Sequence, residues 1–189
     1  MKELKRFCSF LIVAILFTSC TKTTDFYTIQ GEAQGSTYSI KYISNEEKVT
    51  KNQIDSLLTA FDLSLSTYRP DSKISKINAG DSTVVVDEFF TETFQLSNQI
   101  YKETMGLFDP TIGVLVNAYG FGPNKKQEDL SQKQIDSLLQ FVGFDKIVLN
   151  SNKTISKNYK ETFIDFNAIA QGYSVDVVVN YLKSKGIEN

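Results

Sequence analysis

The chain has 189 residues, of which 41% are hydrophobic and 22% are charged, as is usual for one globular domain. Its net charge is −2 and its basic residues are scattered, so nucleic acid is not expected as a partner. Because the chain has no histidine, it cannot form a Ser-His-Asp or Cys-His nucleophile system. The groups that remain for catalysis or metal binding are carboxylates, hydroxyls and carbonyls, and these oxygen ligands favour magnesium among the metals.

The first residues have the composition of a bacterial targeting segment. A basic start precedes the apolar run of residues 10–17, which is too short to span a bilayer as a mature helix. The run leads to Cys20, and a small residue before a cysteine at this place resembles a lipoprotein cleavage site. We therefore predict a signal peptide over residues 1–19, a lipid on Cys20 and a polar tether over residues 20–28. An ordinary signal peptide that ends near a cysteine is the alternative.

The next residues alternate between strand and helix patterns. Residues 27–43 alternate apolar and polar side chains, which predicts paired strands broken at Gly31 and Gly35. Thr50 and Gln53 have the spacing of a capping box, which predicts a helix start. Apolar residues then recur at helical spacing, so one face of this helix is expected in the core.

The middle of the chain continues this alternation. Residues 65–78 predict a loop followed by a short helical turn, and residues 84–86 predict a brief strand. A helix is expected to begin at Asp87 or Glu88 and to end at Gly106.

The last third is expected to hold a further helix and a hairpin. Ser131 with Gln134 predicts a capped helix, and residues 146–149 and 154–156 predict a hairpin. The apolar side chains of this helix are expected to face inward: Ile135, Leu138, Leu139 and Val142. Together these patterns predict an α/β fold, with a mixed sheet flanked by helices.

Residues 161–180 carry the most informative pattern of the chain. A short apolar run leads into a helix with small residues in its first turns, ending near Gly186. The free N–H groups and positive dipole end of such a helix suit an anionic ligand. Asp165 at this junction is unusual beside a phosphate unless a metal or a sugar hydroxyl shares the site. Alternatively, Asp165 caps the following helix.

Two other stretches have both a structural and a functional interpretation. Asp109 before Pro110 is a common helix start, but the surrounding residues 106–123 are rich in glycine and aromatic residues and suit a planar heterocycle. Tyr68 and Arg69 belong either to a plain turn or to a site in which they would stack on a ring and pair with a phosphate.

Four motifs stand in a fixed order along the chain: GEAQGSTYSIKY, STYRPDSKISKIN, TMGLFDPTIGVLVNAYGFGP and IDFNAIAQGYSVDVV. In this order and spacing they resemble the ApbE-type FAD:protein FMN transferases, periplasmic flavinylating lipoproteins, over about residues 29–189. The resemblance implies an ApbE-like fold and Mg²⁺-dependent transfer of FMN from FAD to a Ser or Thr hydroxyl of an acceptor protein, with release of AMP. The acceptor in this family is commonly a membrane redox subunit. The implied location is the cell envelope, with a lipid anchor and the domain facing the periplasm.

The resemblance also implies a set of residues that contact FAD. Gln34 stands where the family usually has a methionine near the flavin. Tyr68 matches a position that lines the FAD site. Leu107, Phe108 and Asp109 match a segment that wraps the cofactor.

The fourth motif carries the remaining site residues. Asp165 matches a carboxylate that contacts FAD, and Gln171 matches a polar or charged FAD contact. Ala168 matches a residue whose backbone carbonyl binds the metal. The general base is not identified by any of these motifs.

Family members continue well beyond a helix like the one that ends near Gly186. We therefore expect this chain to be the N-terminal part of the flavin transferase domain, without the groups that complete the magnesium shell, and we expect no turnover from it alone. A FAD pyrophosphatase that gives FMN and AMP, and a non-catalytic flavin-binding lipoprotein, are the alternative functions.

Overall fold

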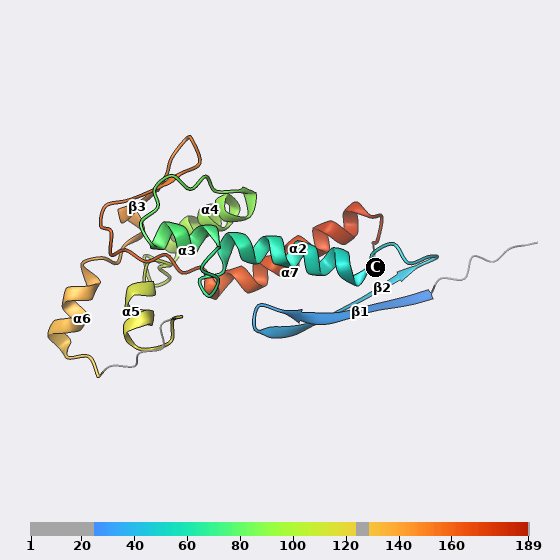
Figure 1. Cartoon of the computed structure of the whole chain (residues 1–189), viewed down its shortest axis with the longest axis horizontal. Helices are drawn as coiled ribbons and strands as arrows, with labels where there is room; N and C mark the ends of the chain where they lie inside the picture. Colours follow the sequence, from blue (N-terminus) through green and yellow to red (C-terminus); the bar gives the residue numbers. More distant parts are fainter. Residues whose placement is uncertain (1–24, 124–128, 189) are drawn as a thin grey trace, which may run out of the picture.

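Two long helices form the axis of the computed structural model, which describes residues 25–123 and 129–188. Helix α2 (Lys51–Leu65) and helix α7 (Asn167–Ser184) run side by side along the length of the molecule (Figure 1). The predicted capping box is confirmed, because Thr50 and Gln53 satisfy each other's backbone N–H groups at the start of α2.

The targeting segment is not part of the described structure. The predicted signal peptide, residues 1–19, and the predicted lipid site at Cys20 lie outside the described residues. The stretch predicted as a tether, residues 20–28, is described only from Asp25, where strand β1 begins. Within residues 25–123 and 129–188, no helix is both long and apolar enough to cross a membrane.

Strands β1 (Asp25–Ala33) and β2 (Ser36–Ser44) form an antiparallel hairpin against α2. Gln34 and Gly35 form the turn at φ values of 55° and 72°, a backbone that suits a two-residue hairpin turn. The predicted break at Gly35 is therefore confirmed.

The predicted break at Gly31 is wrong, because Gly31 pairs with Tyr38 inside the hairpin. A Cβ atom at Gly31 would lie 2.5 Å from the Tyr38 hydroxyl oxygen, so this glycine makes room for the tyrosine ring. The Tyr38 hydroxyl in turn donates to Asp55 Oδ1 at 2.5 Å, which fastens the hairpin to α2. Burial and this hydrogen bond raise the pKa of Tyr38 to about 12.

The remaining elements gather at the other end of the helix pair (Figure 1). They are helices α3 (Lys73–Asn78), α4 (Glu88–Glu103), α5 (Gly113–Ala118) and α6 (Gln132–Leu139), the 3₁₀ turn η1 (Phe144–Lys146), and strands β3 (Ile147–Leu149) and β4 (Ile155–Lys157). The α/β class is confirmed, although the strands form two separate antiparallel hairpins, β1-β2 and β3-β4. The strand predicted at residues 84–86 is wrong, since this segment only donates one hydrogen bond from Val86 N to Lys153 O, at 2.8 Å.

Among the described residues, the buried apolar side chains other than Leu115 form two clusters, and both long helices contribute to each. Phe61 of α2 and Ala170 of α7 belong to the larger cluster, which also includes side chains from α3 and α4 and from the β3-β4 hairpin. Leu58 of α2 and Val178 of α7 belong to the smaller cluster, under the β1-β2 hairpin. Because α2 and α7 take part in both clusters, they connect the two ends of the molecule.

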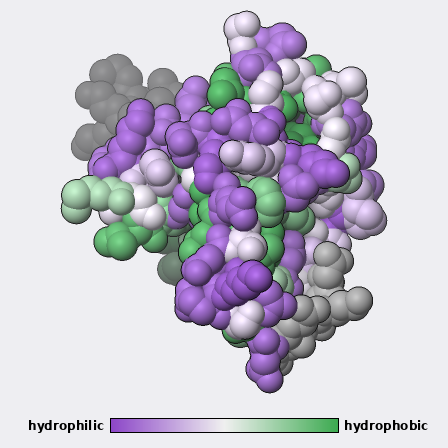
Figure 2. All heavy atoms as spheres, turned by 90° about the vertical axis from the view of Figure 1, so that its left-hand side faces the viewer, coloured by the Kyte–Doolittle hydropathy of each residue, from purple (hydrophilic) through white to green (hydrophobic). Residues whose placement is uncertain are grey.

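Helix α6 is less buried than its sequence predicts. Its predicted capping box at Ser131 is confirmed, but Ile135 and Leu138 are only half-buried. The prediction for Leu139 is wrong, because this side chain is 44% exposed. Figure 2, which faces the end of the molecule that carries α6, shows hydrophobic residues at the surface among hydrophilic ones.

Phe61→Ala should strongly destabilise the fold. Phe61 is 1% exposed and contacts the rings of Phe89 and Tyr173, at centroid distances of 5.4 and 5.7 Å. Loss of a buried aromatic ring should lower the free energy of unfolding by about 3–5 kcal/mol in urea titrations. The control is Leu63→Ala on the same helix, which should cost less than about 1 kcal/mol because Leu63 is 37% exposed. Equal losses from the two variants would contradict the role given to α2.

Candidate functional site

An open cavity of about 610 Å³ lies where the β1-β2 turn, the end of α2 and the start of α7 meet. This volume is in the range of small-molecule sites. Its lining residues are Gln34, Gly35, Phe61, Asp62, Leu65, Ser66, Tyr68, Arg69, Asn167, Ala170 and Gln171. The cavity thus brings together three residues from separate sequence motifs that were predicted to contact FAD: Gln34, Tyr68 and Gln171.

Gln34 presents an unused hydrogen-bond donor at this cavity. Its Oε1 atom lies 3.1 Å from Ser174 Oγ, whose single proton is shared between Gln34 and the closer carbonyl oxygen of Gln171 at 2.7 Å, and this contact ties the hairpin turn to α7. Its Nε2 atom is buried and has no hydrogen-bond partner among the described residues. A buried donor without a partner lowers the stability of the fold, so this atom is a candidate for a hydrogen bond to a ligand.

Tyr68 and Arg69 lie on the loop that follows α2. The Tyr68 ring is 57% exposed, and its hydroxyl donates to the carbonyl oxygen of Phe121 at 3.3 Å. The Arg69 guanidinium donates to both oxygens of Asp71, at 3.1 and 2.8 Å. Ser72 Oγ closes the loop by donating to the Ser66 carbonyl at 2.7 Å. A ring face and a cation are therefore held at the same edge of the cavity.

Asp165 acts on the start of α7 in this structure. Its two carboxylate oxygens accept hydrogen bonds from Asn167 N at 2.8 Å and from Asn167 Nδ2 at 3.2 Å. Burial raises the pKa of Asp165, and the hydrogen bonds from Asn167 oppose this rise. The alternative that Asp165 caps the helix is wrong, because the N-cap of α7 is Phe166, which makes no side-chain cap hydrogen bond. Asp165 instead closes a turn onto Asn167, which lines the cavity.

Asn78 positions Asp165, although no sequence pattern indicated a role for Asn78. Its side chain donates to Ile164 O and accepts from Ile164 N, both at 2.8 Å, as a neighbouring strand would. Lys157 Nζ donates to Thr162 O at 2.8 Å and supports the same segment. The available signal was that Asn78 ends the second motif, directly after the buried Ile77.

The structure does not bring the predicted residues Leu107, Phe108 and Asp109 to the cavity. Leu107 is 90% exposed and Phe108 is half-buried. Asp109 Oδ1 accepts from Thr111 N at 2.8 Å and from Thr111 Oγ1 at 2.6 Å, so Asp109 closes a turn. The prediction that Asp109 caps a helix is wrong, because α5 begins only at Gly113.

The segment that follows Asp109 nevertheless contacts the site. The carbonyl oxygen of Pro110 accepts a hydrogen bond from Asp165 N at 2.7 Å. Thr111 is fully buried, and its hydroxyl oxygen accepts from Gly143 N at 2.7 Å. These bonds fix the backbone beside Asp165.

Ala168, the predicted metal contact, is exposed in the first turn of α7. Within the described ranges, no group of three or more His, Cys, Asp or Glu side chains could hold a metal ion. The carbonyl oxygen of Ala168 is a hard ligand, so the chemistry of this one donor fits the predicted Mg²⁺.

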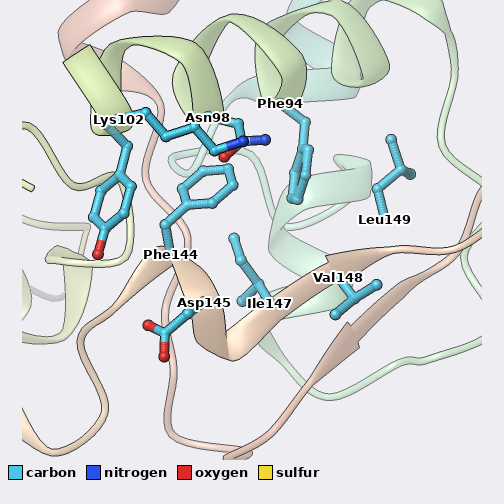
Figure 3. Close-up of a pocket in the computed structure, with 9 residues that line it drawn as sticks. Phe94, Asn98, Lys102, Phe144, Asp145, Ile147, Val148 and Leu149 are labelled. Carbon is cyan, nitrogen blue, oxygen red and sulfur yellow. The ribbon is translucent and has the colours of Figure 1, made fainter.

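A second cavity, of about 400 Å³, lies between α4 and β3 (Figure 3). Its lining is largely apolar, and the rings of Phe94 and Phe144 pack against each other there with a centroid distance of 4.9 Å. None of the residues predicted to bind FAD or metal lines it. The cavity beside α7 is therefore the better candidate site.

The comparison with protein families agrees with the fold and the motif order. The ApbE family profile matches residues 34–189, and the chain belongs to the ApbE family. It is similar to a FAD:protein FMN transferase of Vibrio cholerae serotype O1, with 34% identity over 190 residues, covering 93% of this chain and 54% of the relative. A FAD:protein FMN transferase of Haemophilus influenzae is 29% identical, covering 100% of this chain and 58% of the relative.

Solved structures show the same relationship. The flavin transferase ApbE from Vibrio cholerae superposes with a TM-score of 0.80 at 31% identity, covering 88% of this chain and 56% of that chain. The apo form of the flavinyl transferase ApbE from Pseudomonas stutzeri gives a TM-score of 0.79 at 28% identity, covering 87% of this chain and 55% of that chain. The chain thus spans about half the length of the relatives it matches.

Asp165→Asn should change how stability depends on pH. Burial raises the pKa of Asp165 above its ordinary value of 3.8, so the folded chain holds this proton more tightly than the unfolded chain. The resulting stabilisation is fully present below the ordinary pKa and is lost as the pH rises through the folded pKa. In urea titrations without divalent ions, the wild-type chain should gain stability relative to Asp165→Asn as the pH falls from about 7 to about 4.

Asp81→Asn is the control for this titration. Hydrogen bonds from Thr83 lower the pKa of Asp81, so the stability that Asp81 contributes is present above its ordinary pKa and is lost in acid. The difference between wild type and Asp81→Asn should therefore have the opposite slope. The same slope for both variants would show that burial does not dominate at Asp165.

Proposed function

We propose that this chain takes part in flavin transfer, in which FMN moves from FAD to a Ser or Thr hydroxyl of an acceptor protein and AMP is released. We expect the chain alone to show no turnover. The observation that carries this proposal is the cavity of about 610 Å³, where Gln34, Tyr68 and Gln171 meet at the start of α7. Membership of the ApbE family and the names of the relatives support the same reaction. A membrane redox subunit is the proposed class of acceptor.

The proposed reaction needs a phosphate site, and the start of α7 suits one. The oxygen of the acceptor hydroxyl attacks the FMN phosphorus and gives up its proton to solvent, the pyrophosphate P–O bond breaks, and the bridging oxygen leaves with AMP. In the exposed first turn the N–H of Asn167 donates to Asp165, and those of Ile169 and Ala170 donate to the Phe166 carbonyl. This leaves the Ala168 N–H and the positive end of the helix dipole for an anion. The Arg69 guanidinium also lines the cavity, where it is paired with Asp71.

We also propose Mg²⁺ as the metal. The Ala168 carbonyl would hold it together with phosphate oxygens and water, a set of hard oxygen ligands. When bound, Mg²⁺ stabilises negative charge on transferring phosphoryl oxygens. Each Asp165 oxygen accepts one hydrogen bond from Asn167 and has room for another, so Asp165 would orient the first turn of α7 and also contact FAD.

Tyr68→Ala should weaken FAD binding by roughly threefold to tenfold, since ring stacking contributes about 0.5–1.5 kcal/mol beyond area burial. Binding is measured by quenching of flavin fluorescence in the presence of Mg²⁺. Tyr159→Ala is the matched control, because Tyr159 is 44% exposed and does not line the cavity. If both variants bind FAD as tightly as the wild type, Tyr68 does not contact the flavin nucleotide.

Incubation of the chain with FAD, Mg²⁺ and a candidate acceptor tests the reaction itself. Covalent FMN on the acceptor supports transfer. Release of FMN and AMP without labelled acceptor supports a FAD pyrophosphatase, which uses water in place of the hydroxyl. Binding of FAD without cleavage supports a non-catalytic flavin-binding lipoprotein, and removal of Mg²⁺ by a chelator tests whether cleavage depends on the metal.

We propose that the chain is lipid-anchored at Cys20 in the cell envelope, facing the periplasm. The apolar run of residues 10–17 followed by Ser19 and Cys20 supports this location. Cys20→Ala should abolish incorporation of a labelled fatty acid in cells. Cys8→Ala should keep the label, because Cys8 lies inside the predicted signal peptide. Labelling of the Cys20→Ala protein would refute the anchor.

A further inference from the structure

One wall of the cavity holds a hydrogen-bond donor and an acceptor side by side. The donor is Gln34 Nε2, which is buried and has no hydrogen-bond partner among the described residues. The acceptor is the carboxylate of Asp62, on the last turn of α2, which is half-buried. Both residues line the cavity, and the Gln34 amide lies close enough to influence the titration of Asp62.

The orientation of the Gln34 amide follows from its surroundings. Ser174 Oγ lies 3.1 Å from Gln34 Oε1, on the side of α7. The negative charge of Asp62 favours the NH₂ group on its own side, because the opposite orientation would place two acceptors together. Burial raises the pKa of Asp62, while the Gln34 amide and the Arg69 guanidinium oppose the rise.

We propose that Gln34 and Asp62 form a donor–acceptor pair that recognises a planar heterocycle by hydrogen bonds to one edge of its ring. The complementary ligand edge carries an N–H group next to a carbonyl oxygen or a ring nitrogen. Such an edge satisfies the unused donor and leaves no buried polar group unpaired, and this gives selectivity against analogues that lack the N–H. Tyr68, exposed at the same cavity, provides a ring face for the heterocycle.

This inference rests on the proposed function, because two groups of FAD have the required edge. The pyrimidine ring of the flavin has an N–H between two carbonyl groups, and adenine has an amino group beside a ring nitrogen. A phosphate does not suit this wall, since the Asp62 carboxylate would repel it. One of the two heterocycles of FAD is therefore assigned to Gln34 and Asp62.

The test uses the full chain and four small probes in calorimetric titrations: riboflavin, adenosine, 3-methylriboflavin and N6,N6-dimethyladenosine. Either riboflavin or adenosine should bind the wild type, and methylation that removes its N–H should weaken that binding roughly tenfold. Which of the two binds identifies the ring. Asp62→Ala and Gln34→Met should each weaken binding of the unmethylated probe roughly tenfold. Asp62→Ala should also remove most of the penalty for methylation, because the N–H of the probe pairs with Asp62.

Gln30→Met is the matched control, because Gln30 is exposed on β1 and does not line the cavity. It should bind all probes as the wild type does, and thermal melts should show that every variant folds. The proposal is overturned if neither riboflavin nor adenosine binds, or if the two cavity variants bind and discriminate like the wild type.

Parallel titration with FAD separates this failure from failure of the proposed function. If the wild type and both cavity variants bind FAD equally, the donor–acceptor pair is wrong and the flavin-nucleotide site stands. If the wild type fails to bind FAD but still discriminates a probe from its methylated form, the pair is right and the proposed function is wrong.

Discussion

The packing of α2 against α7 is the constraint on which the rest of the structure depends. Each helix contributes side chains to both buried clusters, so the hairpin end and the helical end of the molecule are held by the same two elements. The cavity lies where the end of α2 meets the start of α7. Because protein interiors are close-packed, a shift of either helix would move two walls of the cavity at once.

Sequence patterns predicted the features whose causes lie within a few residues. The capping box at Thr50 and the turn at Gly35 are of this kind, and both are confirmed. Features that depend on distant partners could not be predicted in this way. Gly31 makes room for the Tyr38 ring on the paired strand, and Asn78 matters because it contacts a segment that lies 86 residues further along the chain.

The candidate site shows the same division between local and distant causes. Motif order indicated the family and named Gln34, Tyr68 and Gln171, which the fold brings to one cavity. It gave no information about Asp62, because a carboxylate on an amphipathic helix has the pattern of an ordinary solvated residue. The contacts of Asp165 were also ambiguous in sequence, and the structure gives both of its oxygens to Asn167.

The hydrogen bond between the hairpin turn and α7 has a consequence for biosynthesis. It joins Gln34 to Ser174, which are 140 residues apart in the sequence. Long-range contacts of this kind form late, since closing the intervening loop costs conformational entropy before the contact can stabilise the fold. On the ribosome, the first motif must therefore wait until α7 has been synthesised before the cavity exists. A ligand of this cavity would bind only after that point, so its binding would show that the β1-β2 turn has packed against α7.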